Sequence, residues 1–489
     1  MSAAREPLRR VAVVGGGPVG ILAAIALRRA LPGCEVVVVG TPASPAAFAD
    51  TSPTALPFTN KLHDRLGLAE IDVVREAGGS YRLVTRFGGW GGAGQAGTLA
   101  YGEVLDPALK TAFARDWGRV RLPGEGASAA GSLAEALAEQ GRFAPPPPGE
   151  LTPISAVDYA LRWHPAAYRA LLIRHAEALG VGYVQGTLDR VEMGSGEDVA
   201  AIGLAGQGMI AADLFLDCSG PQASLLAAHP AFAFTDWSAS LPTRHIYRAP
   251  PAAPVLALED RLTLTEAGWV SEVAGRDGVH RMLGTPAPLP VETVTALLGA
   301  APNAVIALTP GRAAAPWLGN VIALGDAAAR FEPLGPYHLD LAHRQLALLL
   351  EMLPGRAITS HERAEYNRRS VLMMEGVHEL LALHFAGIAA QRVFGARELP
   401  GRVGEVIDQF LRRGRIQFRE EAPLLSQEQF ALLVALGWSP GLPPVALCAG
   451  VADEAHARSV FANDVRAALA FAPPYAQWLA QAVSSAPAG

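Results

Sequence analysis

The stretch VAVVGGGPVGILAAIAL, residues 11–27, decides the fold of this chain. Residues 11–14 are entirely apolar, a run of glycines and a proline follows, and residues 21–29 have the composition of a buried helix. Residues 35–39 (EVVVV) then supply a second strand. Strands that are apolar on both faces are typical of a parallel sheet covered by helices. The stretch therefore predicts a βαβ unit within an α/β fold.

Three glycines at the turn form the pattern Gly-x-Gly-x-x-Gly. Gly15 permits a tight turn, Gly17 lets the backbone approach a pyrophosphate, and Gly20 lets helix and strand pack closely. The phosphates would lie at the helix N-terminus, where free N–H groups favour negative charge. An acidic residue usually holds the adenosine ribose after the second strand, and here that residue is Gly40. The context favours a dinucleotide site over a plain glycine turn, with a weakened contact to adenosine.

Composition and charge exclude several classes of protein. The 489-residue chain has 18% charged residues and a formal net charge of −6, so nothing favours binding to nucleic acid or an anionic membrane. Three cysteines that lie far apart indicate neither a disulfide framework nor a zinc site. No uninterrupted apolar run reaches the roughly 18 residues of a membrane span. We expect a cytoplasmic protein without a bound metal.

Arg9 and Arg10 give the first apolar stretch a superficial likeness to an export signal. The glycines and the proline of residues 15–18 would interrupt the helix of such a signal. We therefore interpret the segment as a buried strand, a tight turn and a buried helix.

A second signal lies some 300 residues further along the chain. Residues 321–324 read as an apolar strand, and Gly325, Asp326 and Ala327 follow it directly. In flavin hydroxylase-type folds such an aspartate accepts hydrogen bonds from the flavin ribityl chain. The alternative is an aspartate that caps the following helix. Together with the N-terminal fingerprint, the pair of motifs favours an FAD-type fold.

Further segments resemble one known family in their order and spacing, over nearly the whole chain. They are SYRLVTRFGGW (80–90), SLAEALAEQGRFAP (132–145), WHPAAYRALL (163–172), ADLFLDCSG (212–220), FEPL (331–334), EYNR (365–368), LHF (383–385), RGR (413–415) and FRE (418–420). The chain resembles the flavin-dependent tryptophan halogenases on these segments together.

The resemblance implies an α/β architecture with a Rossmann-like FAD-binding box domain over residues 1–355. Its nucleotide part would be discontinuous, built from about residues 9–60, 150–225 and 310–355, with an inserted substrate-side sheet. Residues 356–489 would form a mainly helical C-terminal cap, and their mixed three- and four-residue spacing of apolar side chains also favours helices.

One departure from the family lies on the substrate side. The family uses a lysine beside the substrate, which holds or is modified by the oxidised halogen. Alignment without gaps to Trp90 places Arg82 at that position. A guanidinium keeps the charge but does not readily deprotonate, so the exchange is not conservative. If Arg82 faces substrate, Arg82→Ala should alter ligand binding and leave the melting temperature nearly unchanged.

Three more departures affect the reaction itself. The family follows Glu-Pro-Leu with a glutamate and a Ser-Thr pair that orient the electrophile and build the halide pocket, whereas residues 335–337 here are Gly-Pro-Tyr. Pro336 also removes a backbone donor from that place. The family's Trp-x-Trp-x-Ile-Pro is degraded to WVSEVA (269–274), and its flavin-contacting strip reads ADTSPT (49–54). The sequence therefore predicts that the chain does not halogenate in the family's usual manner.

Two functions remain. The first is a flavin-dependent oxidoreductase that oxygenates a small aromatic or peptide-borne substrate, with FAD, or diffusible FADH2 supplied by a separate flavin reductase. The second is a degenerate, non-catalytic homologue that binds a ligand or partners with an active paralogue. Gly40 and the altered 49–54 strip favour the second function, and the intact glycine fingerprint with Asp326 favours the first. A homodimer or a heteromer with a paralogue would fit such a family.

The candidate site residues follow from the motifs and the resemblance. Catalytic roles are expected for Arg82, Tyr337 and His338. Cofactor contacts are expected for Gly15, Gly17, Gly20, Gly325, Asp326 and Pro333. Substrate-side positions are expected for Trp269 and Trp90.

Four neighbouring residues receive plainer interpretations. We expect Asp340 to cap a helix and His343 to face solvent, although both lie near the active-site strip of the family. His378 and His384 are interpreted as core or helix-end residues.

Overall fold

The glycine fingerprint lies between the first strand and the first helix, as the sequence predicts. Strand β1 (Arg10–Val14) leads into helix α1 (Pro18–Ala30), and β2 (Glu35–Gly40) follows. The helix begins three residues before the predicted start, since proline is favoured in the first helical turn, where its missing N–H is not needed. The computed structural model describes residues 6–92, 94–102, 131–194, 197–441 and 451–485.

A six-stranded sheet forms the centre of the nucleotide-binding half. Its order is β19-β20-β11-β1-β2-β7, where β7 is Gly182–Gln185, β11 is Leu214–Asp217, β19 is Trp317–Leu318 and β20 is Val321–Ala323. The five strands from β20 to β7 pair in parallel, and β19 is antiparallel. Buried side chains along these strands explain why the sequence shows apolar runs without alternation.

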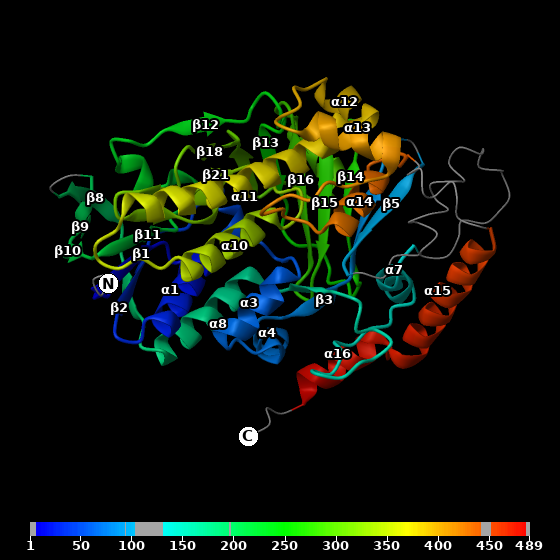
Figure 1. Cartoon of the computed structure of the whole chain (residues 1–489), viewed down its shortest axis with the longest axis horizontal. Coiled ribbons are helices and arrows are strands. Elements are labelled where there is room, and N and C mark those ends of the chain that lie inside the picture. The colour runs from blue at the N-terminus through cyan, green and yellow to red at the C-terminus, as the bar shows by residue number, and fades with distance from the viewer. Residues whose placement is uncertain (1–5, 93, 103–130, 195–196, 442–450, 486–489) are drawn as a thin grey trace.

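Helices cover this sheet. Helix α1 packs against α8 (Pro165–Ala178) and α10 (Tyr337–Glu351), and α10 packs against the long α11 (Ser360–Ala386). Figure 1 shows α11 running across the molecule above α10, from the first sheet toward the second. Helix α10 begins at the turn after Pro333, so the first sheet and the predicted site meet at its N-terminus.

A second sheet of seven strands stands beside the first (Figure 1). Its order is β17-β13-β16-β15-β14-β4-β5, with β4 (Val84–Gly88), β5 (Ala96–Ala100), β13 (His245–Arg248), β14 (Glu259–Leu264), β15 (Trp269–Ala274), β16 (Val279–Thr285) and β17 (Ala304–Ala307). Helix α9 (Val291–Leu298) packs on β16. Strand β4 ends at Gly88 and β5 begins at Ala96, and the two strands pair antiparallel.

Short elements complete the first 355 residues. They are the helices α2 (Phe48–Thr51), α3 (Phe58–Leu66), α4 (Glu70–Glu76) and α7 (Leu133–Glu139), the pair β3 (Ser80–Arg82) and β6 (Ala160–Arg162), the sheet of β8 (Leu188–Met193), β9 (Val199–Leu204) and β10 (Gly208–Ala211), and the sheet of β12 (Phe234–Asp236), β18 (Gly311–Ala313) and β21 (Ala329–Arg330). The 3-10 turns are Gly220–Gln222, Leu226–Ala228 and Gly325–Ala327.

The described part of the chain after residue 356 is helical, which confirms the fold class predicted from the sequence. Its helices are α11, α12 (Ile388–Phe394), α13 (Val403–Arg413), α14 (Ser426–Ala435), α15 (Val451–Phe471) and α16 (Tyr475–Ser484). One continuous core of buried apolar side chains joins both sheets and these helices. The division into domains at residue 355 stays a prediction.

Candidate flavin and substrate site

The glycine fingerprint packs closely against the end of strand β11. Gly15 has a φ of +129°, and a Cβ on it would collide with the carbonyl oxygen of Cys218. A Cβ on Gly20 would collide with the carbonyl oxygen of Gly15. Only glycine therefore permits this approach of turn, helix and strand.

The second fingerprint glycine faces a side chain. A Cβ on Gly17 would overlap the carboxyl group of Asp50, whose Oδ1 accepts a hydrogen bond from the Val19 N–H at 3.0 Å. Burial raises the pKa of Asp50 to about 7, an effect that the nearby Asp326 increases and the Val19 hydrogen bond and Arg169 oppose. A carboxyl group thus stands at the N-terminus of α1, where this type of fold binds phosphate.

The larger cavity at the predicted site has a volume of about 300 Å³. It is lined by the 48–54 segment, the start of α8, strands β13, β15 and β16, and the turn before α10. Phe48, Pro333 and Pro336 give it flat apolar surfaces. Pockets of this size and character suit a ring system of drug-like dimensions. We call it the large cavity.

A smaller cavity of about 30 Å³ adjoins it. Its lining comes from β4, β5, β14 and β15, the 334–337 turn and α11. Five residues line both the large and the small cavity, namely Thr54, Ser271, Val273, Gly335 and Pro336. The 335–336 segment, where the resemblance places the family's glutamate, is therefore part of a common wall of the two cavities, and it carries glycine and proline.

Asp326 and His338 form a locked pair at the edge of the large cavity. Nδ1 of His338 lies 2.5 Å from Asp326 Oδ1, and Nε2 lies 2.9 Å from the Phe331 carbonyl oxygen. The other carboxylate oxygen of Asp326 accepts the Ala49 N–H at 2.8 Å. Both ring nitrogens of His338 are engaged inside the protein, which argues against its predicted role as a free acid or base.

The backbone N–H of Gly325 is also hydrogen-bonded within the protein. Its N–H donates to Gln345 Oε1 at 2.9 Å, and its φ of +60° is the left-handed conformation that glycine favours. The turn that carries Gly325 and Asp326 is thus held against α10 and α2 by hydrogen bonds. Pro333, by contrast, lines the large cavity, where the sequence places a cofactor contact.

Arg82 lies in the wall of the small cavity but its guanidinium is held by the protein. Its side chain is 2% exposed, its Nη1 lies 3.4 Å from Asp260 Oδ2, and its Nη2 donates to the Ala55 carbonyl oxygen at 2.5 Å. Arg162 lies 3.6 Å from the same carboxylate. This buried ion pair argues against the expectation that Arg82→Ala would leave the melting temperature unchanged, because the arginine neutralises a buried charge.

The phenol of Tyr337 is a free hydrogen-bond donor in the wall of the small cavity. Tyr337 is buried at the first residue of α10, and none of the described residues hydrogen-bonds its hydroxyl. Burial raises its pKa well above the ordinary value, so the group stays protonated and can donate. The Arg82 guanidinium, stacked 5.2 Å from the ring centroid of Tyr101, adds a positive charge nearby.

His384 is a site residue that the sequence analysis missed. It is buried, as expected, yet it also lines the small cavity from α11. Its Nδ1 lies 3.1 Å from the Leu380 carbonyl oxygen, which places the proton on Nδ1 and leaves Nε2 as an acceptor. Burial lowers its pKa to about 4, so the ring is neutral at physiological pH. Only the three-dimensional register of α11 against β4 reveals this position.

The two predicted substrate-side tryptophans belong to the core. Trp269 is fully buried, and its indole N–H donates to Thr243 Oγ1 at 3.1 Å. Trp90 donates to the Leu262 carbonyl oxygen at 3.1 Å and packs edge-on against His384, with 5.5 Å between the ring centroids. Neither tryptophan lines the large or the small cavity. Trp90 instead packs against the imidazole ring of His384 and helps to fix its position.

Two interpretations of α10 need correction. Asp340 is buried and pairs with Arg344 at 2.6 Å, one turn further along the helix, and α10 has no side-chain cap. His343 does not face solvent, since it is buried and its Nδ1 lies 2.9 Å from Thr59 Oγ1. Burial lowers the pKa of His343 to about 3, so the ring is neutral. The cause is the packing of α10 on α3, which buries the face that carries both residues.

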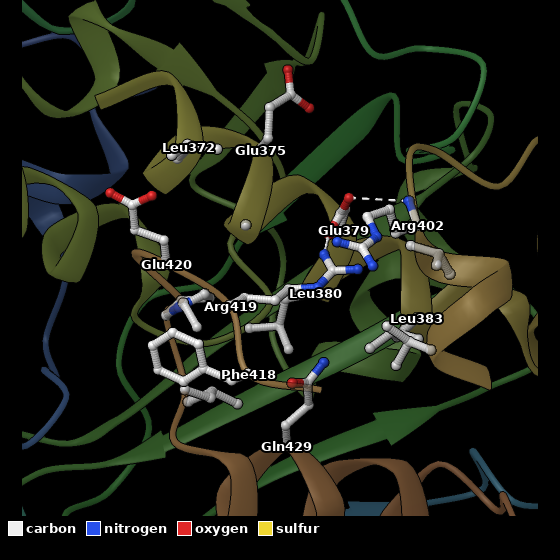
Figure 2. A pocket seen from close by; sticks show the side chains of 16 residues that line it. Leu372, Glu375, Glu379, Leu380, Leu383, Arg402, Phe418, Arg419, Glu420 and Gln429 are labelled. Carbon is white, nitrogen blue, oxygen red and sulfur yellow. Dashed lines mark hydrogen bonds and ion pairs between the residues drawn. The ribbon is translucent and has the colours of Figure 1, made fainter. Parts of the chain in front are cut away.

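A third cavity, of about 300 Å³, lies among the C-terminal helices (Figure 2). It shares no lining residue with the large or the small cavity. Leu380 and Leu383 belong to its apolar wall, while Glu379 pairs with Arg419 and accepts the Arg402 backbone N–H. The charges around this hollow are compensated within the protein.

Two other classes of site receive no support. Among the described residues, no group of three or more His, Cys, Asp or Glu side chains could hold a metal ion. No single helix of the described ranges is long and apolar enough to cross a membrane; α11 and α12 satisfy the criterion only together, and they are bent by 90° at their junction.

Lysine is nearly absent from the chain. Its two lysines are Lys61, which is exposed on α3, and Lys110, which lies outside the described residues. No lysine is among the described residues that line the large cavity or the small cavity. The described lining of the large and small cavities therefore offers no lysine for the role that the resemblance implies.

The residues fit one end of a flavin and not the other. The large cavity, with Phe48, Pro333 and Pro336, offers flat apolar surfaces for a tricyclic ring. The diphosphate end does not fit as the protein stands, because the Asp50 carboxyl occupies the place in front of Gly17.

Comparisons with known proteins agree with this geometry. A family model described as tryptophan halogenase matches residues 10–442. Tryptophan 7-halogenase KtzQ of Kutzneria sp. (strain 744) is 24% identical over 420 residues, which cover 78% of this chain and 76% of that protein. Tryptophan 7-halogenase RebH of Lentzea aerocolonigenes is 23% identical over 417 residues, covering 77% of this chain and 76% of that protein.

Solved structures of flavin-dependent halogenases have the same fold. BrvH from Brevundimonas sp. BAL3 superposes with a TM-score of 0.84 at 25% identity, covering 97% of this chain and 99% of that chain. Xcc4156 from Xanthomonas campestris gives 0.86 at 23% identity, covering 99% and 100%. The family implies the use of FAD or FADH2, a flavin reductase and an aromatic substrate. This chain belongs to the tryptophan halogenase family.

Proposed function

We propose that this chain is a flavin-using oxidoreductase that oxygenates an aromatic substrate and does not halogenate it. The observation that carries the proposal is the common wall of the two cavities. Its five residues, Thr54, Ser271, Val273, Gly335 and Pro336, include no carboxylate and no lysine. A cofactor ring and a substrate ring can thus adjoin, while the groups that would guide an oxidised halogen are missing.

The chain's own residues supply a donor, an acceptor and a fixed charge on the substrate side. Tyr337 stays protonated and can donate to a substrate oxygen or a departing oxygen atom. His384 is neutral and presents Nε2 as an acceptor for an indole N–H or a phenol. Arg82 holds a positive charge in the wall of the same cavity, anchored by Asp260. The small cavity has room for only about two water molecules, so a substrate ring would reach these groups from the large cavity.

The cofactor would supply the two electrons of the reaction. In an oxygenation, one atom of O2 enters the substrate and the other leaves as water, with the two electrons and two protons drawn from reduced flavin. No halide takes part in this balance. A separate flavin reductase, as the family uses, would regenerate the reduced cofactor.

The test is a product assay under conditions that permit either reaction. The full chain, a flavin reductase and flavin are incubated with tryptophan, indole and a tryptophan-containing peptide under 18O2 with bromide present. We expect a product that carries one oxygen-18 atom and no bromine. A product with the isotope doublet of bromine would overturn the proposal.

Two variants connect that product to the small cavity. Tyr337→Phe should lower the rate at least tenfold, because loss of a positioned proton donor typically costs about 100-fold or more. Tyr159→Phe is the matched control. The Tyr159 phenol donates a hydrogen bond of 3.0 Å to Glu70, and Tyr159 lines neither the large nor the small cavity. Equal rates for the two variants would show that the Tyr337 hydroxyl takes no part in the reaction.

One observation favours a second function, that of a non-catalytic homologue that binds a ligand or a paralogue. The Asp50 carboxyl group occupies the position at the glycine fingerprint where the flavin phosphates would bind. A chain that cannot retain flavin would not catalyse a flavin-dependent reaction. Absence of product together with absence of binding of any flavin, oxidised or reduced, would favour this second function.

A further inference from the structure

The phosphate position at α1 is filled by the protein itself. Asp50 belongs to α2, and its Oδ1 accepts the Val19 N–H at 3.0 Å. Its carboxyl group also occupies the space into which a side chain at Gly17 would project. A helix N-terminus with a fingerprint of glycines offers its N–H groups to an anion, and here a carboxyl group of the chain accepts one of them.

The charges near Asp50 oppose a second anion. Asp326 lies close enough to raise the pKa of Asp50 further, beyond the effect of burial. Arg169 is the one cation that lowers it, and its Nε and Nη2 already donate to the Gly16 carbonyl oxygen at 2.5 Å and to Tyr183 Oη at 2.8 Å. A diphosphate in this place would meet two carboxyl groups and a guanidinium that is already engaged.

The adenosine side of the fingerprint is filled as well. The hydroxyl of Tyr183 stands over Gly16 and Gly40, where a Cβ on either glycine would collide with it. Gln185 Nε2 donates to the Gly40 carbonyl oxygen at 2.5 Å, and Tyr183 Oη lies 3.3 Å from Gln185 Oε1. Together with Arg169, these side chains cover the end of β2 where the ribose of a dinucleotide would lie.

The ring end of the site is open and carries an unpaired cation. Arg248 lines the large cavity, and its Nη2 donates to Thr51 Oγ1 at 3.1 Å and to the Pro45 carbonyl oxygen at 3.4 Å. No carboxylate among the described residues pairs with it, whereas the neighbouring Arg281 pairs with Glu272 at 2.8 Å. A guanidinium without a carboxylate at a cavity wall is suited to bind a phosphate.

We propose that this chain binds a flavin mononucleotide, with Asp50 and Tyr183 in the places that the adenylate half of FAD would occupy and with Arg248 as the cation for the single phosphate. The inference rests on the proposed use of flavin, and it changes which flavin the site selects. The adenylate half adds a second phosphate and a nucleoside for which this chain leaves no room, while the isoalloxazine ring keeps its cavity.

The test is a titration of the full, flavin-free chain at pH 8 with FMN, FAD and riboflavin, oxidised and dithionite-reduced, followed by flavin fluorescence and absorbance. FMN should bind at least tenfold more tightly than FAD. Arg248→Met should weaken FMN at least fivefold and leave riboflavin within twofold. FAD that binds as tightly as FMN would overturn the proposal.

Asp50 is tested by its removal. Asp50→Ala should strengthen FAD binding at least fivefold and change riboflavin binding little, because it opens the phosphate position. Asp64→Ala, an exposed aspartate of α3, is the matched control and should change neither. An unchanged FMN-to-FAD ratio in Asp50→Ala would overturn the role of Asp50. Loss of binding of all three flavins by the folded wild-type chain would instead refute the proposed flavin function itself.

Discussion

Buried charged side chains surround the small cavity, and each is compensated by a partner inside the protein. Asp260 is held between Arg82 at 3.4 Å and Arg162 at 3.6 Å, and Arg162 also donates to the Tyr81 and Ala257 carbonyl oxygens at 2.6 Å. Arg82, which the resemblance aligns with the family's lysine, is therefore held by contacts inside the protein.

Removal of Arg82 should destabilise the fold. Arg82→Ala leaves Asp260 with one arginine in a buried place, and we expect a loss of about 3 kcal/mol in the free energy of unfolding, at the lower end of the range for a broken buried ion pair. Urea denaturation measures it. Arg190→Ala is the control, since that arginine is 63% exposed and pairs only with Glu192 on the surface of β8. Equal stability of both variants would contradict the buried network.

A second residue-scale prediction concerns pH. Burial raises the pKa of Glu332 to about 8, which Thr243 and Arg244 only partly offset. Between the ordinary pKa of 4.5 and about 8 the folded chain keeps a proton that the unfolded chain has lost, so stability falls as pH rises through that window. The slope approaches about 1.4 kcal/mol per pH unit for one proton.

Glu332→Gln removes this contribution. The variant should be more stable than the wild type at pH 8, and its stability should change less between pH 5 and pH 8. A residual slope from Asp50, whose pKa is raised to about 7, remains in both proteins. Denaturation midpoints at four pH values decide the matter, and parallel curves for the two proteins would show that Glu332 does not titrate in this window.

Single residues also mark the limit of what the sequence reveals. Pro333, Pro336 and Tyr337 could be assigned to the site from the motif order alone, and all three line one of its cavities. Asp50 and His384 could not be identified. Asp50 reaches Gly17 only because α2 folds back over α1, and His384 reaches β4 only through the tilt of α11.

At the scale of the elements, the β1–α1–β2 unit depends on the close approach of its turn to β11. Gly15 has a φ of +129° and faces the Cys218 backbone. Apolar runs and the glycine spacing were sufficient to predict this unit, because its strands are buried on both faces. The pairing of β4 with β14, some 170 residues apart, could not be predicted from the sequence of either strand alone. The register of a strand depends on its partner strand.

Substitution of Gly15 tests that dependence. Gly15→Ala should lower the free energy of unfolding by more than about 2 kcal/mol, since it combines an unfavourable φ with a backbone collision. Gly33→Ala is the matched control on the loop before β2, where a Cβ meets no atom within 4 Å. Thermal or urea denaturation provides the comparison. A Gly15 variant as stable as the Gly33 variant would mean that the turn can relax away from β11.

At the scale of the whole molecule, two sheets and the helix that joins them create two adjoining cavities from distant parts of the chain. The large cavity draws on residues 48–54, 164–166, 248–282 and 333–338, and α10 begins where the two cavities meet. The fold of the family is thus retained together with a place for a ring, while the lysine, the glutamate and the open phosphate position are missing. Ring binding without halogenation is the function that this combination supports.

The most direct measurement is a crystal structure of the chain with bound FMN. We expect the isoalloxazine ring in the large cavity, against Phe48 and the 333–336 turn, with the phosphate at Arg248 and the Asp50 carboxyl still on the Val19 N–H. Density for the ring at any other place, or a flavin phosphate seated on Gly17 with Asp50 displaced, would contradict the account.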